Sequence, residues 1–239
     1  MTADPARGEP AGSAPSTRPP RTPALEPTGT GNHIAWWAVT ASARALLRTL
    51  FRTRRSRVPI LPEGPLILAP NHRSYLDPLV VGALISRRPI FMMTAKYYDA
   101  KYFGSIYRMA RCIVVERDAD NRRALREAER VLANGRVLVI FPEGTISPDG
   151  ELKELQPGCG WLARRTGAPV YPVHLSGTRE ALPRDTNRLR FVPVGMTLGE
   201  PLSAADYPRG KEGAAAFTDA LRAAMLELES EAEDFSSNL

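Results

Sequence analysis

Short apolar segments alternate with helical segments along most of this chain, and this alternation restricts the fold more than any other feature. Strand-like apolar segments lie near residues 66–70, 90–94, 112–116, 137–141, 170–175 and 189–198. Helical patterns lie near residues 77–86, 101–110, 119–134 and 157–166, and a last helix with an apolar stripe is expected near residues 212–230. Alternating strands and helices pack as an α/β sandwich, so we predict a mostly parallel sheet flanked by helices.

An imidazole and a carboxylate follow the first of these strands. The segment from Asn71 to Asp77 reads NHRSYLD and places His72 and Asp77 five positions apart. In a strand-to-helix turn, Asp77 can return to the His72 ring and leave one ring nitrogen free to take a proton from a hydroxyl. No Ser or Cys nucleophile elbow accompanies the pair. The pattern therefore indicates direct attack by a substrate alcohol, without a covalent acyl-enzyme.

A second turn with polar side chains follows another apolar strand. Residues 137–145 read VLVIFPEGT, so the strand ends in a turn that carries Glu143, Gly144 and Thr145. Ligands of open α/β sheets collect at the carboxyl ends of the strands. We therefore expect the two turns to meet.

Together, the Asn-His-x-Ser-x-x-Asp and Phe-Pro-Glu-Gly-Thr motifs resemble those of the glycerolipid acyltransferase family. The best-known members of that family are the 1-acylglycerol-3-phosphate (lysophosphatidic acid) acyltransferases. The similarity covers roughly residues 37–198 and includes the segments 94–97, 103–104, 112–117 and 168–173. The two motifs in this order and at this interval form a specific pair, whereas either alone would be weaker.

The resemblance implies a role for each motif residue. His72 is expected to be the general base and Asp77 its orienting partner. The expected substrate-binding residues are Arg117, Glu143, Gly144 and Thr145, which hold the phosphate-bearing acceptor, together with Lys96 and Ser74. Three of these residues also have ordinary structural explanations. Glu143 could be a carboxylate that only stabilises its turn, Thr145 could be a helix cap, and Arg117 could form a local ion pair.

The chain departs from the family pattern at two positions. Ile146 follows Gly-Thr where the family often has arginine, and Arg111 stands where a glycine is usual. The loss of a cation from a phosphate pocket bears on the identity of the acceptor more than on the reaction type.

Composition sets further bounds. The 239 residues, 43% of them hydrophobic, suffice for the core of one sizeable domain. Cys112 and Cys159 lie far apart without metal-ligand spacing, so we expect a reducing compartment and neither a disulfide nor a metal site. No stretch reaches 18 uninterrupted apolar residues, which argues against a transmembrane helix, and the polar N-terminal segment is unlike a secretory signal.

The N-terminal region divides into two parts before the expected acyltransferase domain at 58–239. Residues 1–31 contain seven prolines and balanced charges, which is typical of a disordered arm. We expect residues 32–57 to form a basic amphipathic helix, whose six arginines and lack of acids give a charge equal to the net +6 of the chain. Arg44, Arg48 and Arg52 are expected on one side, and the apolar residues Ile34, Trp36, Trp37, Leu46, Leu47, Leu50 and Phe51 on the other. This helix fits an in-plane membrane anchor, and it also fits an ordinary helix with a solvated arginine face.

These observations predict an O-acyltransferase at the cytoplasmic face of the cell membrane. The expected donor is acyl-CoA or acyl carrier protein, and the favoured acceptor is lysophosphatidic acid. No metal or redox cofactor is expected, because thioester energy drives the transfer. Alternatives are a different lysolipid, glycolipid or amino-lipid hydroxyl, or a non-catalytic lipid-binding protein of the membrane surface. Nucleic-acid binding is disfavoured, because the basic charge behind the pI of 9.6 sits in an amphipathic helix and no nucleic-acid motif is present.

Overall fold

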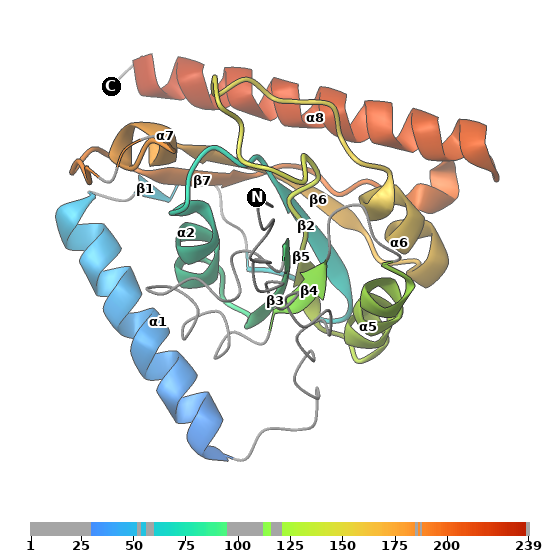
Figure 1. The fold of residues 1–239 in the computed structure, drawn as a ribbon, viewed down its shortest axis with the longest axis horizontal. Coiled ribbons are helices and arrows are strands. Elements are labelled where there is room, and N and C mark those ends of the chain that lie inside the picture. Colours follow the sequence, from blue (N-terminus) through green and yellow to red (C-terminus); the bar gives the residue numbers. More distant parts are fainter. Residues whose placement is uncertain are drawn as a thin grey trace, which may run out of the picture.

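A parallel sheet with helices on both faces forms the centre of the molecule (Figure 1). The computed structural model describes residues 30–51, 54–55, 60–94, 112–115, 121–184, 186 and 188–237. The strands are β1 (Arg54–Arg55), β2 (Leu66–Pro70), β3 (Pro89–Thr94), β4 (Ile113–Val115), β5 (Val137–Val139), β6 (Val170–Ser176) and β7 (Gly195–Leu198). The helices are α1 (Thr30–Leu50), α2 (Asp77–Leu84), α5 (Arg122–Ala133), α6 (Gly158–Thr166), α7 (Thr178–Ala181), the 3₁₀ turn η1 (Ala204–Asp206) and α8 (Lys211–Ser237).

The strands lie in the order β1-β7-β6-β2-β5-β3-β4. The pair β6–β7 is antiparallel, and every other neighbouring pair is parallel. This topology confirms the predicted α/β class with a mostly parallel sheet. The carboxyl ends of β2, β5, β3 and β4 consequently meet at one edge of the sheet.

Strand β2 is central and buried on both faces. Leu66 and Leu68 belong to the apolar core on one side of the sheet, whereas Ile67 and Ala69 belong to the core on the other. Successive side chains of a strand point to opposite faces, so a strand covered by helices on both sides is apolar throughout. Helices α1 and α2 pack on the first core, and α5, α6 and α8 pack on the second.

Helix α1 packs against the domain through part of its apolar surface. Leu47 and Phe51 are buried in the first core, and Nε of Arg44 donates a hydrogen bond of 2.7 Å to the carbonyl oxygen of Ala83 in α2. Leu46 and Leu50 remain 55% and 37% exposed. The expected division into an arginine side and an apolar side is therefore wrong for Arg44, which faces the domain, and for Leu46 and Leu50, which are exposed. The expected helix over residues 32–57 is also too long, because α1 ends at Leu50 and Arg54–Arg55 form β1.

The segment predicted as a strand at 189–198 is paired as a strand only at 195–198, in β7. Pro193 has no backbone N–H to contribute to a sheet, and the donors around it are used elsewhere. The amide of Arg190 bonds the carbonyl of Ala181, and the amide of Val194 bonds the carbonyl of Phe51. The helix predicted at 101–110 lies outside the described residues, and α8 extends to Ser237, beyond the predicted end at 230.

Gly177 joins β6 to α7 in a conformation that few other residues tolerate. Its φ angle is +72°, and a Cβ atom there would lie 2.0 Å from the carbonyl oxygen of Pro193. Gly167 has a similar φ angle of +71°, but a Cβ atom there would meet nothing within 4 Å.

These two glycines form a matched pair of tests. Gly167→Ala should cost about 1 kcal/mol of unfolding free energy, the strain of a left-handed backbone. Gly177→Ala should cost clearly more, because the same strain is joined by a backbone clash. Chemical denaturation of both variants measures the difference. Equal losses would contradict the contact between Gly177 and Pro193.

Candidate active site

The turn after β2 is fixed to the neighbouring strand β6 at Asn71, the residue that precedes His72. Asn71 is buried, and its side-chain amide exchanges two hydrogen bonds with the backbone of Leu175. Nδ2 of Asn71 donates to the Leu175 carbonyl at 3.1 Å, and Oδ1 accepts from the Leu175 amide at 2.7 Å. Asn71 thus anchors the turn, a role that the sequence did not reveal because its partner lies 104 residues away.

His72 and Asp77 are in direct contact. Nδ1 of His72 lies 2.9 Å from Oδ2 of Asp77, the first residue of α2. A carboxylate accepts hydrogen bonds and cannot donate them, so Nδ1 carries the hydrogen and Nε2 keeps a lone pair when the ring is neutral. The geometry is that of a general base and the acid that orients it.

Asp77 also shapes the backbone of the turn. Its Oδ2 atom accepts the amide hydrogens of Arg73 and Ser74, each at 2.7 Å, and the side chain is fully buried. Bonds from N–H groups stabilise a carboxylate that burial alone would disfavour. The start of α2 adds its positive end to this compensation.

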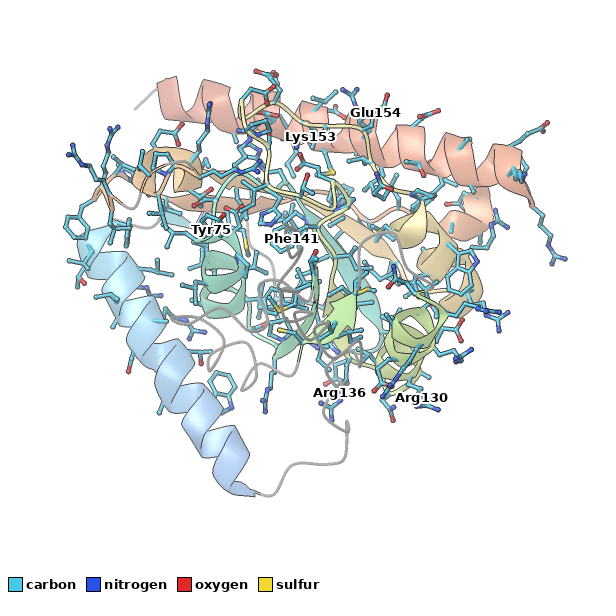
Figure 2. All side chains as sticks on the ribbon, in the orientation of Figure 1. Tyr75, Arg130, Arg136, Phe141, Lys153 and Glu154 are labelled. Atoms are coloured by element: carbon cyan, nitrogen blue, oxygen red, sulfur yellow. The ribbon has the colours of Figure 1, made fainter. Side chains whose placement is uncertain are left out.

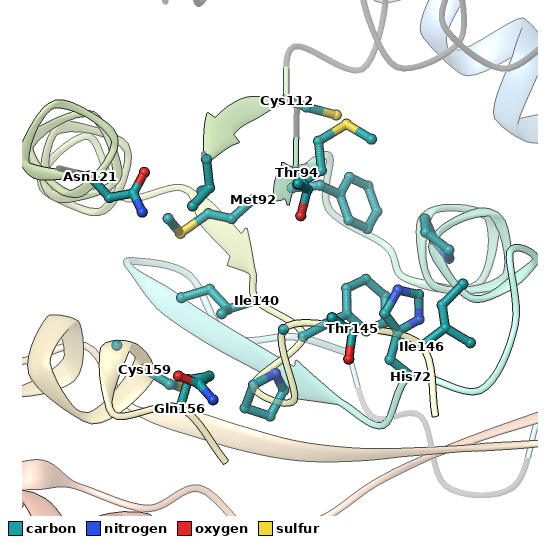
Figure 3. Close-up of a pocket in the computed structure, with 18 of the residues that line it drawn as sticks. His72, Met92, Thr94, Cys112, Asn121, Ile140, Thr145, Ile146, Gln156 and Cys159 are labelled. Carbon is teal, nitrogen blue, oxygen red and sulfur yellow. The ribbon is translucent and has the colours of Figure 1, made fainter. Parts of the chain in front are cut away.

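The His72 ring lines an apolar cavity of about 420 Å³ at the carboxyl ends of four parallel strands. The ring stacks on Phe141, with ring centroids 4.1 Å apart and planes inclined by 28°. Figure 3 shows His72 beside Thr145 and Ile146, with Met92, Thr94 and Cys112 on the opposite side of the cavity. Apolar walls around a single imidazole suit a long hydrocarbon chain with its reactive end at His72.

Glu143 connects the two turns. Its Oε1 atom accepts the amide hydrogen of His72 at 2.7 Å, and Oε2 accepts that of Lys153 at 3.3 Å. The amide of Ser147 also bonds the carbonyl of His72 at 2.7 Å. Burial raises the pKa of the Glu143 carboxyl above its usual range, and the two backbone bonds lower it. Glu143 therefore holds the backbone of His72 in place.

The expected substrate-binding residues occupy different surroundings. Gly144 and Thr145 line the cavity. Ser74 is fully buried, and its hydroxyl donates to the carbonyl of Leu182 and accepts from the amide of Leu76. Lys96 and Arg117 lie outside the described residues.

Neither Glu143 nor Ser74 lines the cavity. Glu143 faces the backbone of the His72 turn, and a carboxylate there would repel a phosphate. The Ser74 hydroxyl has no access to the cavity, because its bonds close the same turn. Both side chains hold the turn of His72 in place, and their binding of the acceptor stays a prediction.

The cysteines on the cavity wall are poorly suited to act as nucleophiles. Burial raises the pKa of the Cys112 thiol to about 12 and that of Cys159 to about 12. The thiol form is a weak nucleophile, so neither side chain fits a covalent acyl intermediate. Within the part of the chain that the structure describes, no group of three His, Cys, Asp or Glu side chains is placed to hold a metal ion.

A mostly parallel sheet with an imidazole–carboxylate pair at its carboxyl edge is an arrangement that can activate a hydroxyl group. The chain belongs to the acyltransferase family, since the family model described as "Acyltransferase" matches residues 49–176.

Curated relatives agree with this assignment. The chain is 30% identical over 140 residues to a 1-acyl-sn-glycerol-3-phosphate acyltransferase of Limnanthes alba, covering 57% of this chain and 50% of the relative. It is 28% identical over 171 residues to the enzyme of that name from Bacillus subtilis, covering 70% of this chain and 82% of the relative. The chain thus spans about half the length of the Limnanthes relative.

A solved structure shares the fold. The 1-acyl-sn-glycerophosphate (LPA) acyltransferase of Thermotoga maritima superposes with a TM-score of 0.67 at 22% identity, covering 83% of this chain and 81% of that one. Among the described residues, no helix is both long and apolar enough to cross a membrane.

His174, which is buried, provides a pH test of the fold around the site. His174 lies in β6 with 4% of its surface exposed, and burial lowers its pKa to about 4, helped by the charge of Arg73. In the unfolded chain the ring binds a proton near pH 6.5, whereas the folded protein does not bind it until about pH 4. The protein should therefore lose stability as the pH falls through this window, by about 3 kcal/mol in all.

Chemical denaturation at pH 7 and pH 4.5 measures this loss. The free energy of unfolding should fall less between these two pH values in His174→Gln than in the unmodified protein. An unchanged difference would contradict the neutral, buried state of His174.

Proposed function

We propose that the protein transfers a fatty acyl group from a thioester to the hydroxyl of 1-acylglycerol 3-phosphate, giving phosphatidic acid. The observation that carries this proposal is the contact between His72 Nδ1 and Asp77 Oδ2 beside an apolar cavity. The names of the Limnanthes and Bacillus relatives support this acceptor. The donor belongs to the acyl-CoA or acyl carrier protein class, whose thioester supplies the driving force.

In the proposed reaction, Nε2 of His72 removes the proton of the acceptor hydroxyl as its oxygen attacks the thioester carbonyl. The oxyanion of the tetrahedral intermediate then reforms the carbonyl and expels the thiolate, which takes up the proton held by His72. Asp77 stabilises the imidazolium that exists between these two proton transfers. No metal or redox cofactor takes part in this sequence. Arg117 stays a predicted phosphate contact.

We further propose that α1 binds the cytoplasmic face of the membrane in the plane of the lipid headgroups. Trp37, Leu46 and Leu50 are exposed by 52%, 55% and 37%, although large apolar side chains usually avoid water. Arg48 is exposed on the same helix, and the segment 32–57 carries six arginines without an acid. Apolar side chains and positive charge together suit an anionic lipid surface.

The catalytic proposal predicts the behaviour of two variants. His72→Ala should lower turnover by at least about a hundredfold, the low end for general-base catalysis, without unfolding the protein. Asp77→Asn preserves the shape but loses the charge that stabilises the imidazolium, so most of the turnover should disappear.

Acyl transfer to lysophosphatidic acid, measured at pH 8, provides the test. His174→Gln is the matched control, because this buried histidine lies outside the cavity, and it should retain turnover. Near-normal turnover in a folded His72→Ala protein would refute the mechanism.

The membrane proposal predicts a loss of binding from three substitutions. A variant with Trp37→Gln, Leu46→Gln and Leu50→Gln should be released from anionic vesicles, and higher salt should weaken binding of the unmodified protein. Trp161→Gln with Leu226→Gln is the control, because these apolar side chains are also exposed, at 43% and 39%, but lie on α6 and α8. The measurement is the fraction of protein that sediments with the vesicles. A fraction that changes neither with the α1 substitutions nor with the salt concentration would contradict the proposal.

A further inference from the structure

The side chain of Ile146 cannot supply a cation to the acceptor. Ile146 is 3% exposed and lines the apolar cavity. Its carbonyl oxygen points instead to two basic side chains from elsewhere in the chain. Nζ of Lys153 donates to this oxygen at 3.3 Å, and Nη1 of Arg184 donates to it at 3.1 Å.

These two cations share one oxygen without a carboxylate between them. Among the described residues, neither Lys153 nor Arg184 forms an ion pair. The charge of Lys153 contributes to the lowered pKa of the nearby Asp149, but Asp149 itself bonds Ser147 and the amide of Glu151. Two like charges that share one oxygen and form no ion pair can attract an anion.

The cationic pair adjoins the reacting end of the cavity. Nζ of Lys153 donates to the hydroxyl of Thr145 at 3.1 Å, and Figure 3 shows Thr145 beside His72. Figure 2 shows Lys153 on the loop that leads from β5 to α6, near α8. An ammonium group has three N–H donors, so a third remains after the bonds to Thr145 and Ile146.

The chemistry of the proposed acceptor fits this arrangement. In 1-acylglycerol 3-phosphate, the phosphate ester sits on the carbon next to the one that bears the reacting hydroxyl. When that hydroxyl lies against Nε2 of His72, the phosphate must lie close by. Thr145 lines the same cavity as His72, and Lys153 bonds the Thr145 hydroxyl.

We propose that Lys153 and Arg184 bind the phosphate of the acceptor and thereby determine the preference of the enzyme for phosphate-bearing acceptors. This inference rests on the proposed function. Lys153 approaches from the loop before α6 and Arg184 from the segment after α7, so the two supply the charge that the side chain at position 146 lacks.

Binding to the inactive His72→Ala protein tests the inference apart from turnover. The probes are 1-hexanoylglycerol 3-phosphate and its uncharged counterpart 1-hexanoylglycerol, below their micellar concentrations, titrated by calorimetry. Lys153→Gln keeps a donor for Thr145 but removes the charge. It should weaken binding of the phosphate probe roughly ten- to a hundredfold, the usual effect of losing a charge-assisted bond. Arg184→Gln should act in the same direction, and neither variant should alter binding of the uncharged probe.

Two further variants separate charge from structure. Lys153→Arg should restore binding of the phosphate probe, and Lys211→Gln, which removes the same charge from an exposed position at the start of α8, should change nothing. Phosphate binding by Lys153→Gln as tight as by Lys211→Gln would overturn the inference. So would an equal loss for both probes, which would mean that Lys153 only supports the loop. Failure of the unmodified enzyme to acylate lysophosphatidic acid would instead refute the proposed function, whatever the binding experiment shows.

Discussion

The buried carboxylate of Asp77 is the constraint on which the site depends. One oxygen, Oδ2, accepts the hydrogens of His72 Nδ1 and of the Arg73 and Ser74 amides. A buried charge is costly unless hydrogen-bond donors compensate it. Here the donors are backbone amides of the turn and the His72 ring. The backbone conformation of the turn and the orientation of the His72 ring therefore follow from the same group. Removal of the whole carboxylate, as in Asp77→Ala, would affect both.

The second turn completes the site through backbone contacts. Glu143 accepts the amide hydrogen of His72, so the two motifs stay in register although they lie 71 residues apart. The cavity has an apolar wall at the ends of β3 and β4, which includes Met92 and Val115, and a more polar end at Thr145. A fatty chain and a polar headgroup would occupy these two regions, with the reacting atoms at His72 between them.

The sequence predicted the parts of the fold that depend on local pattern. Residues 66–70 form β2 as predicted, because an uninterrupted apolar segment bounded by prolines matches a strand buried on both faces. The predicted helix at 157–166 corresponds to α6 at Gly158–Thr166, which follows Pro157 and ends at Gly167 in the left-handed conformation. Contacts between distant segments were not predictable in this way. The bond from Ser74 to Leu182 spans 108 residues, and the two cations at Ile146 come from separate loops. The sequence therefore predicted the contact between His72 and Asp77, but it gave no sign of the backbone partners of Glu143 and Ser74 in distant segments.

The tautomer of His72 tests the central claim most directly. In protein labelled with ¹⁵N in its histidines, the nitrogen shifts distinguish a ring protonated at Nδ1 from one protonated at Nε2, and the spectrum of His72→Ala assigns the signal. At a pH where the ring is neutral, the contact with Asp77 predicts hydrogen on Nδ1 and a lone pair on Nε2. A neutral His72 with its hydrogen on Nε2 would contradict the account. Nε2 would then have no lone pair with which to take a proton from the acceptor.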